Sequence, residues 1–183
     1  MANEERDLEG RTVGVTGLPS DDAVLDAILR SDGAAPGAVE RRVIGFDAVA
    51  ALSAGRVDAA TAFWNAEGVA LRELGLPTRE FRVESVAGEF PELLVVTTRE
   101  LADSEPELVD GVQAGIRRGY ELAADDPAAA LDDLLAAVPG LDPAVQEAQM
   151  EALTAADAFT AGVDPGTVDP SRIANWRRFA RSG

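Results

Sequence analysis

The chain of 183 residues contains no cysteine, no histidine and no lysine, and all 16 of its basic residues are arginine. Without cysteine it forms no disulfide, thiolate nucleophile or cysteine metal site. Without histidine it lacks the usual general base and the imidazole metal ligand, and a Ser-His-Asp triad is excluded. Without lysine it has no Schiff base and no phosphate-loop lysine. The sequence therefore predicts a protein that is not an enzyme, with no catalytic residues, no metal site and no cofactor.

The chain is strongly acidic, with 33 Asp and Glu residues and a net charge of −17. Such a surface repels nucleic-acid phosphates and anionic membranes, so neither is expected as a partner. No apolar run approaches the ~20 residues that cross a bilayer, and the charged start lacks the apolar region of a signal peptide. These features predict a globular protein that is either cytoplasmic or exported with a leader that this sequence does not contain.

Strand and helix patterns alternate in the first half of the chain. After a polar leader (1–10), β-branched and apolar runs predict strands at 11–16, 42–46 and 57–63. Amphipathic segments predict helices at 21–30, 48–54 and 67–74. The alternation predicts an α/β lobe with a parallel sheet and crossover helices.

The second half of the chain is expected to be mainly helical. Residues 81–86 alternate in the manner of a half-exposed strand, and the continuous apolar run 93–97 predicts a buried strand. Four later segments each have proline near their start, which is typical of a helix N-terminus; they are 106–124, 127–137, 143–153 and 170–181. The fold class predicted is thus an α/β lobe followed by a helical C-terminal portion.

The third predicted strand leads into an aromatic pair, an amide and a carboxylate: Phe63, Trp64, Asn65 and Glu67. The rings can give apolar contact to a planar small molecule, while the amide and the acid can hydrogen-bond to its edge. The rings can equally be ordinary core residues, with the carboxylate facing the helix dipole. The segment alone leaves both interpretations open.

The ends of the other two predicted strands also carry candidate residues. The turn after the first strand precedes a helix, whose free N–H groups can hold an anion or a polar ligand group, although Ser20 or Asp21 can cap that helix instead. After the second strand, Phe46 can pack in the core and Asp47 can be an N-cap. Because parallel strand ends converge at one edge, the expected ligand-binding residues are Gly17, Pro19, Ser20, Asp21, Phe46, Asp47, Phe63, Trp64, Asn65 and Glu67.

Several segments, read in order, carry a resemblance to a known family. They are residues 8–15, 43–52 and 55–68, followed by 90–98, 118–120 and 126–127, and the most specific is Phe63-Trp64-Asn65-Ala66-Glu67-Gly68. From Leu8 to Trp176 the chain resembles the substrate-binding proteins of ABC importers. The group it resembles most binds thiamine pyrimidine precursors and includes taurine and alkanesulfonate binders.

The resemblance implies a periplasmic-binding-protein type II fold, in which two α/β lobes close on a ligand. Residues 11–88 would form lobe two, and residues 89–183, a strand plus helices, would belong to a lobe one that lacks its upstream part. It also implies a small planar heterocycle such as a thiamine pyrimidine precursor as ligand, an ABC permease as partner, and an extracytoplasmic location for the full-length protein. The strand at 93–97 would lack neighbours, so we expect a homodimer or strand exchange to cover the exposed apolar face.

Two further interpretations concern the function: an enzyme activity and a protein-interaction domain. Some eukaryotic relatives are enzymes that build the pyrimidine from pyridoxal phosphate and one of their own histidines, and they need a lysine for the cofactor. This chain has neither residue, so its chemistry excludes that activity. The competing interpretation is a stand-alone protein-interaction domain whose apolar edge binds a protein partner, without a role in small-molecule transport.

Overall fold

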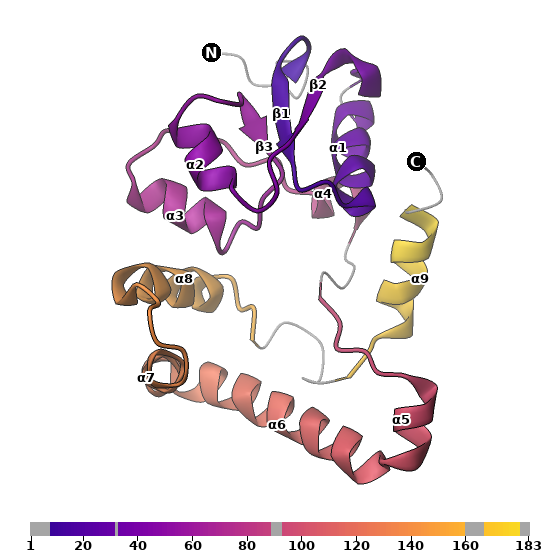
Figure 1. The fold of residues 1–183 in the computed structure, drawn as a ribbon, viewed down its shortest axis with the longest axis vertical. Coiled ribbons are helices and arrows are strands. Elements are labelled where there is room, and N and C mark those ends of the chain that lie inside the picture. Colours follow the sequence, from indigo (N-terminus) through magenta and orange to yellow (C-terminus); the bar gives the residue numbers. More distant parts are fainter. Residues whose placement is uncertain (1–7, 32, 89–92, 160–166, 180–183) are drawn as a thin grey trace. The chain divides into compact units, whose positions relative to one another are not determined.

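The computed structural model describes residues 8–31, 33–88, 93–159 and 167–179 (Figure 1). The chain divides into two compact units. Unit 1 comprises Met1–Pro91 with Pro170–Gly183, and unit 2 comprises Glu92–Asp169. Part of the predicted polar leader, residues 1–7, lies outside the described residues.

Unit 1 is built on a three-stranded parallel sheet. Its strands are β1 (Thr12–Val15), β2 (Glu40–Val43) and β3 (Ala59–Ala60), in the order β2-β1-β3. Thr12 pairs with Glu40, and Val13 pairs with both Arg41 and Ala59. The central strand β1 has neighbours on both edges, and Val13 and Val15 are only 2% and 4% exposed. Gly14, which faces the opposite side of the sheet, is buried as well, and burial on both faces explains why this strand reads as a short apolar run.

Helices cover both faces of the sheet, with α1 on one side and α2 and α3 on the other (Figure 1). The chain crosses from β1 to β2 in one direction and from β2 to β3 in the other, and right-handed crossovers then place successive helices on opposite faces. The helical elements of unit 1 are α1 (Pro19–Ser31), the 3₁₀ turn η2 (Pro36–Ala38), α2 (Ala48–Ser53), α3 (Glu67–Glu73), α4 (Glu84–Ala87) and α9 (Pro170–Phe179).

The core of unit 1 lies between β1 and α1. The apolar stripe of α1 supplies Leu25 and Leu29, and the latter is fully buried. They pack with Val13, Val15 and Val39. Burying side chains of this size stabilises the fold by roughly 1.5–3 kcal/mol each. Packing between β1 and α1 therefore holds the sheet in place.

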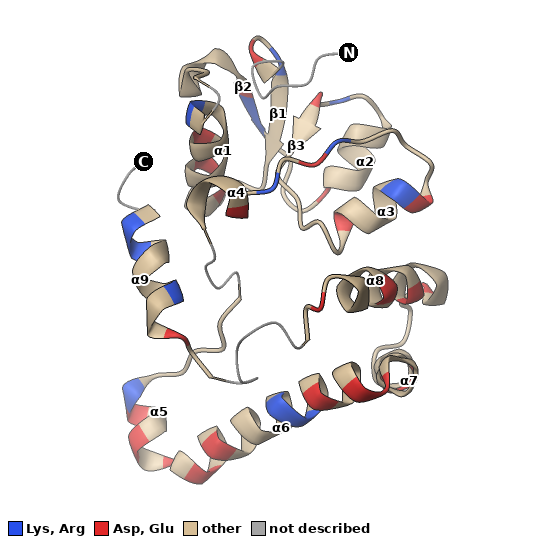
Figure 2. Cartoon of the chain, turned by 180° about the vertical axis from the view of Figure 1, so that it is seen from behind, with Lys and Arg blue, Asp and Glu red and all other residues tan. Residues whose placement is uncertain are grey.

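Unit 2 is helical, with α5 (Arg99–Ser104), α6 (Pro106–Asp125), α7 (Pro127–Ala137) and α8 (Pro143–Ala155). Two of these helices begin with an aspartate cap followed by proline. The side chain of Asp126 accepts a hydrogen bond from Ala129 N (3.0 Å), and that of Asp142 accepts one from Ala144 N (2.9 Å). Such caps satisfy free N–H groups of the first turn. Acidic side chains recur along the helices of this unit (Figure 2).

The predicted strand at 81–86 is wrong. Its second half begins α4, and the Ser85 hydroxyl donates to the carbonyl of Arg82 (2.7 Å) within this turn. Apolar and charged residues do alternate here, but Arg82 and Glu84 form an ion pair, two residues apart. Val83 between them has the backbone conformation of a right-handed helix, so the alternating pattern here occurs in a helical turn and not in a strand.

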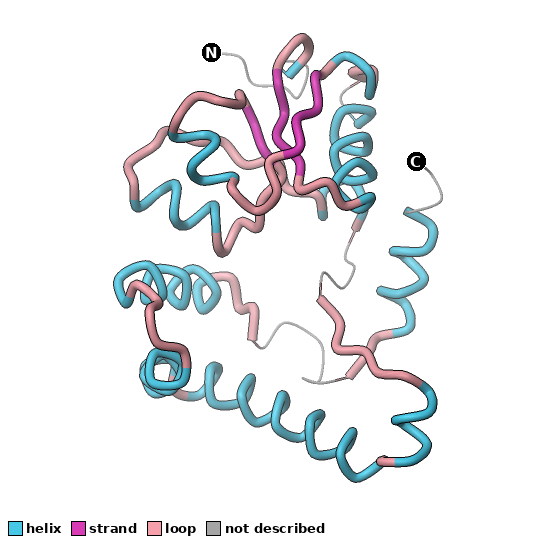
Figure 3. The backbone as a smooth tube through the Cα atoms, in the orientation of Figure 1, coloured by secondary structure: helices cyan, strands magenta, loops and turns pink. Residues whose placement is uncertain are grey.

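The predicted buried strand at 93–97 is also wrong, because the structure shows an unpaired, exposed segment there (Figure 3). Leu93 is 83% exposed and Val96 is 80% exposed. An apolar run becomes a buried strand only where a neighbouring strand offers hydrogen-bond partners, and the described residues supply none. The strand does not form in the described residues, and the exchange of a strand with a second copy stays a prediction.

Other expected boundaries shift. The second strand ends at Val43 rather than residue 46, and β3 covers two residues of the predicted 57–63. The helix α9 groups with unit 1, where Asn175 Nδ2 donates to the carbonyl of Ala87 (3.0 Å). Residues 180 and 181 of that predicted helix lie outside the described residues. The assignment of residues 11–88 and 89–183 to two lobes of a binding protein stays a prediction.

Among the helices that the structure describes, none combines the length and the apolar character needed to cross a bilayer.

Candidate functional site

The carboxyl ends of the three strands meet at one edge of the sheet, because all three are parallel. Three connections leave this edge: residues 16–18 after β1, residues 44–47 after β2 and residues 61–66 after β3. All ten predicted ligand-binding residues lie on these connections or in the first turn of the helices that follow. The topology therefore brings together segments that are more than 40 residues apart in the sequence.

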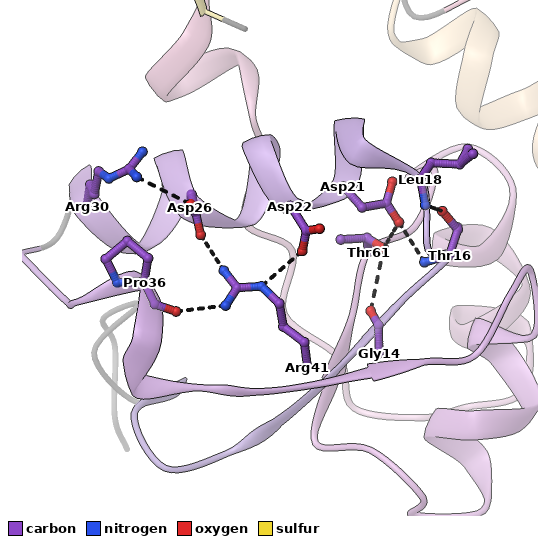
Figure 4. Close-up of polar contacts among 10 residues, drawn as sticks. All are labelled: Gly14, Thr16, Leu18, Asp21, Asp22, Asp26, Arg30, Pro36, Arg41 and Thr61. Carbon is purple, nitrogen blue, oxygen red and sulfur yellow. Dashed lines mark hydrogen bonds and ion pairs between the residues drawn. The ribbon is translucent and has the colours of Figure 1, made fainter. Parts of the chain in front are cut away.

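Asp21 faces inward at this edge (Figure 4). Its Oδ2 accepts hydrogen bonds from Thr16 N at 2.7 Å and from Thr61 Oγ1 at 2.8 Å. The hydroxyl of Thr16 in turn accepts from Leu18 N (3.2 Å), a local turn typical of threonine. Asp21 thus connects the β1–α1 turn to the end of β3 and does not act as a simple N-cap.

Thr16 and Thr61 are site residues that the sequence prediction missed. Each is the first residue after a parallel strand in the structure. A threonine repeated at that position is a signal that could have found them, since hydroxyls at strand ends are placed to bond across to neighbouring connections.

The turn after β1 depends on Gly17. Its φ is +94°, a left-handed conformation that favours glycine. A Cβ there would also lie 3.2 Å from Val43 Cγ1 on the neighbouring strand. Pro19 begins α1 and is exposed, while Ser20 is half-buried. The turn therefore brings the start of α1 close to β2, at the sheet edge.

The connection after β2 presents an aromatic ring. Phe46 is 74% exposed, so the interpretation that it packs in the core is wrong. Asp47 stands at the N-cap position of α2, yet its side chain makes no capping hydrogen bond. Instead Asp47 Oδ2 lies 2.6 Å from Arg56 Nη2 in an ion pair. The arginine competes successfully for the carboxylate that was expected to cap the helix.

The connection after β3 folds back on itself. Glu67 Oε2 accepts a hydrogen bond from Phe63 N (2.9 Å), which closes the loop around Trp64 and Asn65. Phe63 is 40% exposed. Trp64 is half-buried, and the guanidinium carbon of Arg82 lies 4.6 Å from its ring centre. The rings therefore belong to the surface of the sheet edge and not to its interior.

Asn65 and Gly68 complete this loop. Asn65 is half-buried, and its amide forms no hydrogen bond within the part of the chain that the structure describes. Gly68 is buried, and a Cβ on it would lie 3.2 Å from Glu80 Oε1 and 3.6 Å from the Phe63 carbonyl oxygen. A side chain at this position would press on the Glu80 carboxylate, which favours glycine after Glu67.

A cluster of ion pairs lies between β2 and α1 in the same unit (Figure 4). Arg41 forms ion pairs with Asp22 and Asp26, and its Nη1 donates to the carbonyl of Pro36 (2.9 Å). The Arg41 Nε lies 3.0 Å from Asp22 Oδ1 without the alignment of a hydrogen bond. Asp26 also pairs with Arg30. The charges of this cluster pair with one another, and these ion pairs connect α1 to β2.

The candidate site presents apolar ring surface and hydrogen-bonding groups. Phe46 and Phe63 expose ring surface, the Asn65 amide has no hydrogen-bond partner among the described residues, and the carboxylates of Asp21 and Asp47 are engaged by donors of the chain itself. Within the described ranges, no group of three or more Asp, Glu, His or Cys side chains is placed to hold a metal ion. A shallow apolar hollow in unit 2, lined by residues such as Pro127 and Met150, contains none of the predicted residues.

Comparison with known proteins identifies the family. The profile of the NMT1/THI5-like family matches residues 3–130. The formylaminopyrimidine-binding protein of Halalkalibacterium halodurans is 27% identical over 151 residues, which are 81% of this chain and 46% of that protein.

A solved structure shows the same fold. The alkanesulfonate-binding protein SsuA from Xanthomonas axonopodis pv. citri, bound to MOPS, superimposes with a TM-score of 0.70 at 20% identity. The match covers 97% of this chain and 58% of SsuA, so the chain spans about half the length of these relatives. Both the sequence match and the fold confirm the resemblance: this chain belongs to the NMT1/THI5-like family and has the α/β fold of type II periplasmic binding proteins.

Proposed function

We propose that the chain is a solute-binding component of an ABC importer that binds a small planar heterocycle and carries out no catalysis. The observation that supports this most is the convergence of three connections, bearing Phe46, Phe63 and Asn65, at one carboxyl edge of a parallel sheet. Open α/β sheets bind ligands at this edge. The names of the similar proteins, a formylaminopyrimidine binder and an alkanesulfonate binder, are consistent with a small solute.

The chemistry of the edge favours an aminopyrimidine. An aromatic heterocycle gains contact with exposed rings, which prefer offset or edge-on arrangements. The Asn65 amide has both a donor and an acceptor to offer. Glu67 uses Oε2 to hold Phe63 N, and its Oε1 is left to accept from an exocyclic amino group. A ligand with ring nitrogens and an amino group therefore matches the loop after β3.

In this proposal the full-length protein acts outside the cytoplasm and delivers its solute to an ABC permease. A receptor of this kind needs a specific binding edge and no reactive group, which agrees with a chain that has no Cys, His or Lys.

Isothermal titration calorimetry tests the proposal with a formylaminopyrimidine, hydroxymethylpyrimidine, a flavin and taurine as probes. We expect binding of a pyrimidine, and Asn65→Ala to weaken it about tenfold, since a hydrogen bond contributes roughly 1 kcal/mol and a group left unpaired costs more. Trp64→Ala should weaken binding, whereas Trp176→Phe, which removes the other indole from the same unit, should leave it unchanged. If the folded protein binds none of the four probes, the proposal is wrong.

A second candidate function rests on a separate observation. In the described residues of unit 2 the one buried apolar side chain is Ala123, while several large apolar side chains are exposed. We propose that a second copy of the chain covers the apolar segment 93–96, as a homodimer. If the chain forms a dimer but Trp64→Ala affects stability alone, the stand-alone interaction domain becomes the better description.

A further inference from the structure

Two arginines hold Trp64. The guanidinium carbon of Arg82 lies 4.6 Å from the centre of the indole, within the range of a cation–π contact. Arg72, on α3, points its Nη2 at the main-chain carbonyl oxygen of Trp64 (3.4 Å). The ring and the backbone of the same residue are thus contacted from two different segments.

The orientation of Arg82 is itself fixed by two carboxylates. Its Nε donates to Glu84 Oε1 at 2.7 Å, and its Nη1 lies 3.5 Å from Glu80 Oε2. Glu80 also forms an ion pair with Arg72. The four side chains are between 33% and 48% exposed, and their charges cancel. A planar guanidinium held along its edge by carboxylates keeps its face against the ring, which a lysine ammonium cannot do.

This arrangement has a consequence for ligand access. An indole has two faces, and the guanidinium covers one of them. Trp64 as a whole residue is half-buried. A flat molecule that stacks on this ring has to use the face opposite the guanidinium, and the ring must not rotate if Asn65 and Glu67 are to meet the edge of that molecule.

We propose that Arg82 is a positioning residue of the ligand site, which fixes the Trp64 indole and leaves one face for an aminopyrimidine. The inference rests on the proposed function, because it assigns Arg82 a part in the same site. Arg82 acts through the ring and does not contact the ligand. Its removal leaves the ring mobile, so binding weakens because the ring has to be ordered when the ligand arrives.

The test uses the full chain with Trp176→Phe, which leaves Trp64 as the single tryptophan. Arg82→Ala and Arg82→Lys are compared with Arg79→Ala. Arg79 is the matched control, because it carries the same charge, lies in the same segment and stacks 4.8 Å from Phe81 instead of Trp64. Acrylamide quenching and near-ultraviolet circular dichroism report the ring in the ligand-free protein, and titration with hydroxymethylpyrimidine and a formylaminopyrimidine reports affinity.

We expect Arg82→Ala to make Trp64 more accessible to acrylamide and to weaken pyrimidine binding about two- to fivefold, the size expected from loss of an exposed cation–π contact. Arg82→Lys should fall between this variant and the parent, and Arg79→Ala should match the parent in both measurements. Urea unfolding of each variant confirms that the protein is folded under the assay conditions.

Unchanged quenching in Arg82→Ala would overturn the inference, and so would tighter binding, which would make Arg82 a competitor for the ring face. The two proposals fail differently. If the parent binds none of the four probes named above, the proposed function is lost, and the quenching contrast between Arg82→Ala and Arg79→Ala alone decides whether Arg82 fixes the indole.

Discussion

At the residue scale, the most connected polar group of the sheet edge is the carboxylate of Asp21. One of its oxygens accepts from the backbone N–H of Thr16 and from the hydroxyl of Thr61. A half-buried polar group needs hydrogen-bond partners, and Asp21 has two. The three groups consequently depend on one another, and loss of either donor leaves the acid less satisfied.

Thr61→Val removes the hydroxyl and keeps the shape of the side chain. We expect the free energy of unfolding to fall by about 1–2 kcal/mol, because hydrogen bonds to charged groups contribute roughly 1.5–3 kcal/mol and part of this is recovered from solvent. Urea unfolding followed by far-ultraviolet circular dichroism gives the value.

Thr12→Val is the matched control for this variant. The Thr12 hydroxyl makes only a 3.4 Å contact with the exposed Glu40 carboxylate. Its substitution should change stability by less than about 0.5 kcal/mol, as surface changes usually do. Equal effects of the two variants would show that the Asp21 network does not contribute to stability.

The position of the candidate residues in the fold could be predicted from sequence where residue type and topology agree, while their binding of a ligand stays a prediction. Strand order and parallel pairing bring Gly17, Phe46 and Phe63 to one edge, and the pattern of alternating strands and helices is enough to expect this. The sequence does not show that Asp21 and Asp47 bond to other residues of the chain, because this depends on which donors lie within reach of each carboxylate in the folded structure. Arg56 and Thr61 are such donors; the threonine repeated after two strands marks Thr61 as a candidate, whereas nothing in the sequence assigns Arg56 to Asp47.

At the element scale, β1 is constrained by its position in the centre of the sheet. Gly14 is buried between its two neighbouring strands, and a Cβ there would lie 2.5 Å from Ile44 Cδ1 and 3.5 Å from Ala60 Cβ. The side chain of Ile44, just after β2, occupies the space above this glycine. Close packing of this kind leaves no room for added volume.

Gly14→Leu should displace Ile44 and lower the free energy of unfolding by about 1–3 kcal/mol, the usual cost of overpacking a filled interior. Differential scanning calorimetry measures the loss as a lower melting temperature. Gly37→Leu serves as the control, because no heavy atom lies within 4 Å of a Cβ at that exposed position. A variant at Gly14 as stable as the variant at Gly37 would contradict the packing described here.

Elements with local signals were predicted best. Helix α7 spans residues 127–137 as expected, and α6 and α8 begin at their prolines, because a capping side chain and proline act within one turn. Strands were predicted less well. The apolar run at 93–97 and the alternating run at 81–86 have strand composition, but a strand also needs a neighbour, and composition carries no information on that neighbour.

At the scale of the whole molecule, charge and apolar exposure oppose each other. The net charge of −17 favours separation of copies, while the segment 93–96 exposes apolar side chains that favour contact. Salt at 0.1 M screens interactions between exposed charges more than about 10 Å apart and leaves apolar association in place. Self-association is therefore expected to increase with ionic strength.

Leu93→Glu should reduce self-association, since it places a charge in the most exposed part of this segment. Sedimentation equilibrium at low and high salt measures the dimer fraction. Leu74→Glu, at a position 60% exposed in unit 1, is the control and should behave like the parent. A chain that stays monomeric at every salt concentration would remove the basis for the homodimer.

The hydrogen bonds from Thr16 and Thr61 to Asp21 also bear on how the sheet edge moves. Since the Asp21 carboxylate bonds both to the turn after β1 and to the end of β3, we expect these two connections to move together. A ligand that restrains either connection should slow amide hydrogen exchange in both, so that binding at one side of the sheet edge also affects the other side.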